Sequence, residues 1–163
     1  MSRLYDCNKQ VFFNAEQFMS YHKALYFKDY DIANKILHSI NPSRIKEYDL
    51  LIRGYDSTLW KEIREDIITL GTYYKFKCNL SIFDTLIHYD ADLSLRYNTL
   101  WWYRVIDTSP HDDSFWDGMQ LLGKCLMKVI KIIQTNDLKQ IKNLETKIYK
   151  DINVNSNKET RYS

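Results

Sequence analysis

The stretch of residues 14–27, NAEQFMSYHKALYF, decides the fold of this chain. It mixes aromatic and aliphatic residues with three titratable groups. Asn14 is typical of a residue that caps the start of a helix, and Gln17, three positions later, can complete a capping box. The spacing of the apolar residues then predicts a helix over residues 15–27. Its apolar side comprises Phe18, Met19, His22, Leu25 and Tyr26.

Helical spacing of apolar residues recurs along most of the chain, and only four Gly and two Pro interrupt it. Gly71 lies inside one such pattern, where close packing or a kink would explain the missing side chain. The further predicted helices are 29–40, 44–54, 59–76, 80–87 and 117–134. Residues 93–106, rich in aromatic and β-branched side chains, are the best β candidate. The sequence therefore predicts a mainly α, single multihelical domain with a small β element near residues 93–106.

The C-terminal part of the chain has a different character. Apolar residues at helical spacing predict an amphipathic helix of modest apolarity after residue 136, and the polar sequence from 153 onward is typical of disorder. We therefore expect residues 1–135 to form the domain, and residues 136–163 to add an amphipathic helix and a disordered tail.

Composition excludes several classes of function. A net charge of +2 over 163 residues gives no support for binding to nucleic acid or to an anionic membrane. The three cysteines lie far apart without a CxxC pattern, so we expect neither a metal site nor another cofactor. Walker, GxGxxG, HExxH and GxSxG motifs are absent from the sequence. The polar N-terminus does not resemble a signal peptide, and we expect a cytoplasmic (intracellular) location.

Glu16, Ser20 and Lys23 share one face of the first predicted helix, at steps of four and three residues. The helix dipole favours an ionised carboxylate in the first turn, and a Glu there is also a common helix-start device. Seven residues of helix rise ~10.5 Å, so the Glu16 carboxylate and the Lys23 ammonium are too far apart for an ion pair. They could instead hold opposite ends of a sugar phosphate, with the carboxylate near the anomeric carbon.

Other polar and aromatic residues have a structural interpretation beside a functional one. His22, on the apolar side of the helix, is best explained as a buried histidine with one hydrogen-bond partner. Arg64 and Lys75 could add positive charge to a phosphate site, although basic residues on helices are usually solvated. The aromatic cluster at residues 101–103 could stack a heterocycle or pack in the core. Paired Asp residues in loops are usually turn formers.

Several short motifs follow one another in a characteristic order over roughly residues 11–131. The residues that carry them are Asn14, Ala15, Glu16, Gln17, Lys23, Ala24, Phe27, Asp29, Pro42, Lys46, Tyr55, Asp56, Trp60, Arg64, Gly71, Lys75, Phe76, Asn79, Trp116, Gly118, Leu121, Leu122, Gly123, Lys124, Leu126 and Met127. This ordered set resembles the NADAR superfamily, and within it the YbiA-like N-glycosidases.

The chain departs from the family pattern at two places. Where the family has an Asp, two residues and then Trp-Gly, this chain has Asn98 and the pair Trp101-Trp102. Where the family has Gly-Arg after its lysine, this chain has Asp49-Leu50. The segment before the first helix is also shorter than in the family. Either Glu16 acts here with other partners, or part of the activity is lost.

The resemblance implies hydrolysis of the N-glycosidic bond of early riboflavin-pathway intermediates, in a role of metabolite damage control. In these compounds an aminopyrimidine is joined to ribose 5-phosphate, and the products are the free aminopyrimidine and ribose 5-phosphate. Glu16 would be the catalytic carboxylate, because the reaction passes through an oxocarbenium-like state that a carboxylate stabilises while it activates water.

The resemblance also implies a set of substrate-binding residues. Lys23 and Lys75 would anchor phosphate or sugar hydroxyls, with Arg64 adding charge, and Trp101 would stack the departing pyrimidine. Asn98 stands where the family has an Asp and would also bind the substrate, but its amide cannot donate the proton that helps the pyrimidine leave.

Two alternatives stay open at this point. Other NADAR members remove ADP-ribose from modified guanine, and the departures at Asn98 and Trp102 also fit a catalytically weakened nucleotide-binding module. The expected partner is a small ribosylated pyrimidine. We expect no membrane partner, and nucleic acid only if an ADP-ribosylated base is the substrate.

Overall fold

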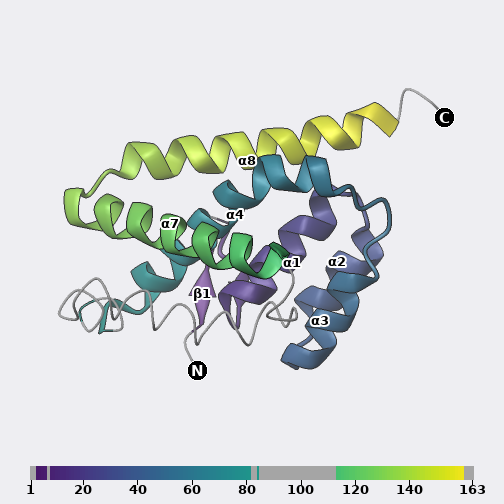
Figure 1. Cartoon of the computed structure of the whole chain (residues 1–163), viewed down its shortest axis with the longest axis horizontal. Helices are drawn as coiled ribbons and strands as arrows, with labels where there is room; N and C mark the ends of the chain where they lie inside the picture. Colours follow the sequence, from purple (N-terminus) through teal and green to yellow (C-terminus); the bar gives the residue numbers. More distant parts are fainter. Residues whose placement is uncertain (1–2, 7, 82–83, 85–112, 160–163) are drawn as a thin grey trace.

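The computed structural model describes residues 3–6, 8–81, 84 and 113–159. Among them are a two-stranded hairpin and six helices, so the predicted mainly α fold is confirmed (Figure 1). In chain order these are β1 (Leu4–Tyr5), β2 (Val11–Phe12), α1 (Ala15–Tyr26), α2 (Tyr30–Leu37), α3 (Pro42–Leu50), α4 (Ser57–Cys78), α7 (Asp113–Thr135) and α8 (Leu138–Glu159). The β element predicted at residues 93–106 lies outside the described residues. Within the described ranges, no helix has both the length and the apolarity needed to cross a bilayer.

The hairpin before α1 was not predicted from the sequence. β1 and β2 pair antiparallel, with Leu4 opposite Phe12. Asp6 closes the turn, because its Oδ1 accepts hydrogen bonds from the backbone N–H groups of Asn8 and Gln10 at 2.9 and 2.8 Å. The hairpin delivers the fully buried Phe12 ring to α1, where it meets Phe18 edge to face with ring centroids 5.1 Å apart.

The start of α1 confirms the predicted helix cap and adds a contact with α2. Asn14 Oδ1 accepts from the Gln17 N–H at 2.8 Å. Gln17 Oε1 reaches back to the N–H of Phe13, one residue before the cap, at 2.7 Å. Its Nε2 donates to the carbonyls of Ile36 and Leu37 at the end of α2. The fully buried Gln17 therefore joins the first turn of α1 to the last turn of α2.

The helices α2 and α3 are shorter than predicted. Asp29 caps α2 and Asn41 caps α3, whose first residue is Pro42. The third helix ends at Leu50, four residues before the predicted end at residue 54, because the following loop is tied back to the start of α2. In that tie, Arg53 Nη2 donates to the buried Asp29 Oδ1 at 2.8 Å, and hydrogen bonds from Arg53 lower the pKa of Asp29 to about 2.

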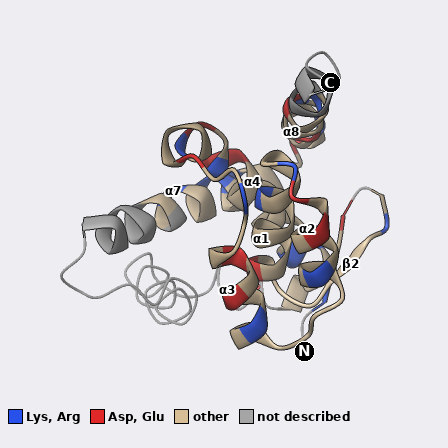
Figure 2. Cartoon of the chain, turned by 90° about the vertical axis from the view of Figure 1, so that its right-hand side faces the viewer, with Lys and Arg blue, Asp and Glu red and all other residues tan. Residues whose placement is uncertain are grey.

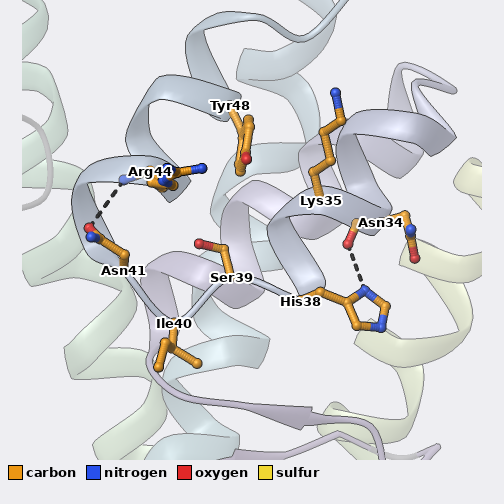
Figure 3. A pocket seen from close by; sticks show the side chains of 8 residues that line it. All are labelled: Asn34, Lys35, His38, Ser39, Ile40, Asn41, Arg44 and Tyr48. Atoms are coloured by element: carbon orange, nitrogen blue, oxygen red, sulfur yellow. Dashed lines mark hydrogen bonds between the residues drawn. The ribbon is translucent and has the colours of Figure 1, made fainter.

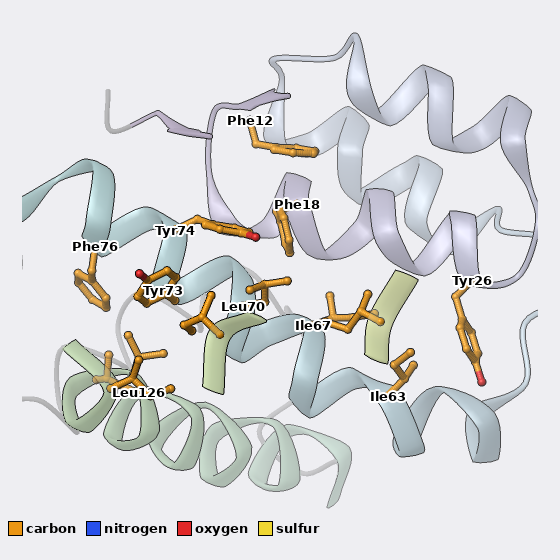
Figure 4. Close-up of a cluster of buried hydrophobic side chains, with 14 of the residues drawn as sticks. Phe12, Phe18, Tyr26, Ile63, Ile67, Leu70, Tyr73, Tyr74, Phe76 and Leu126 are labelled. Atoms are coloured by element: carbon orange, nitrogen blue, oxygen red, sulfur yellow. The ribbon is translucent and has the colours of Figure 1, made fainter. Parts of the chain in front are cut away.

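The long helix α4 is the centre of the core. Its buried residues include Ile63, Ile67 and Leu70, which face α1 and the α7–α8 pair (Figure 4). Gly71 confirms the close packing that the sequence suggested: a Cβ at this position would lie 2.6 Å from Cδ1 of Phe18. The missing side chain thus lets the Phe18 ring lie against the backbone of α4.

The hairpin of α7 and α8 packs against α4 and completes the core, and α8 also contacts α1 (Figure 1). Asn136, with a φ of 52°, makes the left-handed turn between the two helices. Both helices contribute to the hydrophobic cluster, through Leu126, Val129, Ile132, Ile141, Ile148 and Ile152. The helix α8 runs to Glu159, although the sequence from 153 onward was expected to be disordered. The division into domain and appendage stays a prediction.

His22 links α1 to α8 and is buried, as the sequence suggested, with two partners rather than one. Its Nδ1 donates to the Phe18 carbonyl at 2.8 Å, and its Nε2 lies 3.2 Å from the Tyr149 hydroxyl. Burial lowers the pKa of His22 to about 4, so the ring is neutral near pH 7 and Nε2 accepts from Tyr149. A second polar contact to α8, from Tyr74 to Glu145, supports the same interface.

The packing at Gly71 gives a matched test of this architecture. Gly71→Ala is expected to lower the free energy of unfolding by about 1–3 kcal/mol, because the new Cβ overpacks the core against Phe18. Gly123→Ala is the control: nothing lies within 4 Å of a Cβ there, so better helix propensity should raise stability by about 0.5–1 kcal/mol. Urea unfolding followed by circular dichroism measures both, and equal shifts would contradict the packing described.

Candidate functional site

Glu16 lies in the first turn of α1 and is partly buried. Burial and the nearby negative charge of Asp49 raise its pKa from an ordinary 4.5 to about 7, against a smaller opposing effect of the Lys46 charge. The sequence had suggested that the helix dipole would favour the ionised form, but burial and the charge of Asp49 shift the pKa in the opposite direction. A carboxyl group with such a pKa can gain or lose a proton near neutral pH, as general acid–base chemistry requires.

Lys23 lies two turns further along α1, on the same face as Glu16. Its Nζ donates to Asp49 Oδ2 at 2.9 Å, and both side chains are mostly buried, with 13% and 19% of their surface exposed. The ammonium also lies 4.7 Å from the ring centre of Tyr55 and 5.4 Å from that of Trp60. It is therefore held between a carboxylate and two aromatic faces. As expected, no ion pair joins Glu16 to Lys23 among the described residues.

Asp49, on α3, presents its two carboxylate oxygens to different surroundings. Oδ2 receives the Lys23 ammonium. Oδ1 is buried, and it has no hydrogen-bond partner within the part of the chain that the structure describes. Figure 2 shows acidic and basic residues close together on α3, the helix that also carries Lys46. The charge of Asp49 acts on both Lys23 and Glu16: Asp49 forms an ion pair with Lys23, and its negative charge raises the pKa of Glu16.

The loop between α3 and α4 brings the two aromatic rings to Lys23. Gly54 adopts a φ of 73°, a left-handed conformation that residues with a side chain rarely take. The next residue, Tyr55, packs its ring on Phe27 at the end of α1, with centroids 5.3 Å apart. The α4 helix then begins at Ser57, with Asp56 as its N-cap, and Trp60 lies in its first turn. The site is thus assembled from α1, α3 and the start of α4.

Arg64 and Lys75 occupy the same side of α4, since eleven residues correspond to about three full turns of helix. The contacts of Phe18 with Gly71 and of Lys23 with Trp60 show that α1 and α4 run antiparallel. Lys75 therefore lies toward the Glu16 end of α1, and Arg64 toward the Lys23 end.

Lys75 is partly buried, and the loss of solvation lowers the pKa of its ammonium to about 8. No described contact joins Arg64 to Glu16. Two other predicted site residues, Asn98 and Trp101, lie outside the described residues, as does Trp102.

The structure adds residues that the sequence had not assigned to the site. Asp49 was noticed only as a departure from the family pattern, and Lys46, Tyr55 and Trp60 only as matches to it. The available signal for Asp49 was that a carboxylate stands where the family pattern has a glycine. The tertiary contact with Lys23, 26 positions earlier, was not visible in the sequence.

A separate surface pocket of about 460 Å³ lies between α2 and α3 (Figure 3). Arg44 and Tyr48 line it from α3, roughly opposite the face that carries Lys46 and Asp49, because each residue turns a helix by about 100°. It is lined by Asn34, Lys35, His38, Ser39, Ile40, Asn41, Arg44 and Tyr48. This pocket does not include Glu16 or Lys23.

Comparison with known proteins agrees with the resemblance seen in the sequence. Residues 2–134 match the NADAR domain, which is most of the chain and ends just before α8. The chain is also similar to N-glycosidase R617 of Acanthamoeba polyphaga mimivirus, with 30% identity over 132 residues that cover 71% of each protein. The chain belongs to the NADAR family.

The raised pKa of Glu16 predicts a pH-dependent effect on stability. Because the folded pKa is above the unfolded value, the stabilising contribution is complete below pH 4.5 and is lost as the pH rises through about 7. Glu16→Gln cannot ionise, so it should be more stable than the parent at pH 8 by about 1–2 kcal/mol, the partial exposure of the side chain limiting the gain. At pH 5 the two proteins should differ little.

Glu47→Gln, on an exposed residue of α3, is the control and should change stability little at either pH. Urea unfolding at the two pH values measures the difference. A gain for Glu16→Gln of the same size at pH 5 and pH 8 would show that ionisation of Glu16 is not its cause.

Proposed function

We propose that this protein hydrolyses the N-glycosidic bond of ribosylamino-pyrimidine 5-phosphates, the early riboflavin-pathway intermediates, to a free aminopyrimidine and ribose 5-phosphate. The coarser class, a hydrolase of N-glycosyl bonds, follows from membership of the NADAR family and from the similarity to an N-glycosidase. The observation that carries the proposal is Glu16, a partly buried carboxyl group with a pKa of about 7, on the helix face that it shares with Lys23.

The reaction needs a negative group near the anomeric carbon. As the bond from that carbon to nitrogen breaks, positive charge develops on the carbon and on the ring oxygen. Ionised Glu16 stabilises this charge and accepts a proton from the attacking water, whose oxygen forms the new bond to carbon. The leaving nitrogen keeps the bonding electron pair and takes up a proton, for which none of the described residues is assigned as the donor.

The remaining site residues bind the substrate in this proposal. Lys23 and Lys75 hold the phosphate or the sugar hydroxyls, and Arg64 adds positive charge, so that binding energy away from the reacting carbon is used for positioning. Trp101 and Asn98, which lie outside the described residues, stay proposed substrate-binding residues, and Trp101 would stack on the pyrimidine. The proposed reaction uses Glu16, water and a proton and includes no metal or other cofactor, and we propose a role in metabolite damage control because such aminopyrimidines are reactive.

Replacement of the catalytic carboxylate tests the proposal directly. Purified protein mixed with the ribosylamino-pyrimidine phosphate should release ribose 5-phosphate, measured by an enzyme-coupled assay. Glu16→Gln should reduce the rate by about 10²–10⁴ because the positioned base is lost. Glu47→Gln should keep the parent rate. A Glu16→Gln protein as active as the parent would remove Glu16 from the mechanism.

Two other outcomes of the same assay would point elsewhere. Release of ADP-ribose from ADP-ribosylated guanine, without cleavage of the pyrimidine substrate, would identify an ADP-ribosyl hydrolase. Tight binding of the pyrimidine substrate with no release would identify a nucleotide-binding module.

The pKa of Glu16 also predicts the pH profile. Since the base must be ionised, kcat/KM should rise with pH and reach half of its plateau near pH 7. Lys46→Met removes the positive charge that lowers this pKa and should move the midpoint to higher pH. Lys61→Met, which removes an exposed charge on α4, should leave it in place. A midpoint near pH 4.5 in the parent protein would contradict a buried catalytic carboxylate.

A further inference from the structure

The carboxylate of Asp49 has one oxygen in use and one without a partner. Oδ2 binds the Lys23 ammonium at 2.9 Å, whereas Oδ1 is buried and accepts no hydrogen bond from the described residues. It is the sole buried side-chain polar atom in this condition within the described part of the chain. Because a buried charged oxygen without a donor is costly, such an atom calls for a specific explanation.

The neighbours of Asp49 identify what kind of group could fill this position. Lys23 is already engaged with Oδ2, and neither Tyr55 nor Trp60, whose ring centres lie 4.7 and 5.4 Å from the ammonium, donates a hydrogen bond to Oδ1. Glu16, whose pKa Asp49 raises, is an acceptor once it is ionised for the reaction. The vacant oxygen therefore suits a hydrogen-bond donor that belongs to a ligand rather than to these side chains.

The proposed function supplies that donor. If Glu16 acts at the anomeric carbon of a ribose, a carboxylate whose charge acts on Glu16 lies beside the same sugar. The group adjacent to the anomeric carbon in ribose is the 2-hydroxyl. We propose that Asp49 is a specificity residue, whose Oδ1 accepts a hydrogen bond from the 2-hydroxyl of the bound ribosyl group. This inference rests on the proposed function, since it needs a ribosyl substrate over Glu16.

The ion pair with Lys23 prepares Asp49 for this role. With Oδ2 fixed by the ammonium, and the ammonium fixed by two rings, the carboxylate has its orientation set before the ligand arrives. Preorganisation of this kind lowers the cost of binding. A site built to bind a hydroxyl discriminates strongly against an analogue without it, because the buried acceptor is then left unpaired. The site should therefore distinguish ribose from 2-deoxyribose.

Calorimetric titration of the full chain with ribose 5-phosphate and 2-deoxyribose 5-phosphate tests the proposal. A hydrogen bond to a charged acceptor should make the parent protein bind the ribose compound roughly tenfold to a hundredfold more tightly. Asp49→Ala should reduce this ratio to near one, and Asp49→Asn, which keeps the size of the side chain, should reduce it to a few-fold. Glu47→Ala, at an exposed residue two positions before Asp49 on α3, should keep the parent ratio.

The ratio separates recognition of the hydroxyl from a structural role. If Asp49 only positions Lys23, Asp49→Ala weakens both sugar phosphates equally and the ratio persists, which overturns the proposal. Equal binding of the two compounds by the parent protein overturns it as well, whether or not Asp49→Ala folds, and so does failure to bind either. The proposed function fails separately, when the pyrimidine substrate releases no ribose 5-phosphate.

Discussion

Phe18 rests on the backbone of α4 at the one place where that helix has no side chain to keep it away. The contact between Phe18 and Gly71 fixes the distance between α1 and α4. The amide of Gln17 fixes α1 on its other side, through three carbonyls at and after the end of α2. Because α1 packs against α4 and α2 through these residues, its face with Glu16 and Lys23 is turned toward α3. The site therefore depends on the packing of apolar residues that take no part in its chemistry.

The electrostatics around ionised Glu16 work against folding. Glu16 is held in a place where its ionised form is disfavoured by burial and by a second carboxylate. Such arrangements are found at functional sites and are sustained by stability from elsewhere in the molecule. Here the stability comes from the core around α4 and from its packing with α7 and α8. His22 on α1 and Tyr74 on α4 add hydrogen bonds to α8.

The chain departs from its family in the placement of carboxylates. It has Asn98 where the family pattern has an Asp, and Asp49 where the pattern has a Gly. The second change puts a negative charge next to Lys23, a residue that a phosphate would otherwise be free to approach. In the proposed function, a substrate phosphate would share Lys23 with Asp49 or bind at Lys75 and Arg64. A sugar hydroxyl would meet no such competition if it binds the second oxygen of Asp49, as we propose.

Local signals in the sequence were sufficient for most of the helices. Asn14, Asp29, Asn41 and Asp56 cap helices through short-range hydrogen bonds, and such contacts depend on residues only two or three positions apart. The face shared by Glu16 and Lys23 also follows from helical spacing alone. The end of α3 was placed four residues too late, because the Asp29–Arg53 contact that shapes the following loop spans 24 positions.

By itself the sequence determined the family, the mainly α class and the candidate catalytic carboxylate, since these rest on local patterns and on the order of motifs. Only the tertiary structure decided the raised pKa of Glu16 and the partner of Lys23. A pKa depends on the solvent that burial removes and on charges brought near by folding, and neither can be read from spacing along one helix. The ion pair of Lys23 with Asp49 exists because α3 packs beside α1, an arrangement that no residue of either helix specifies alone.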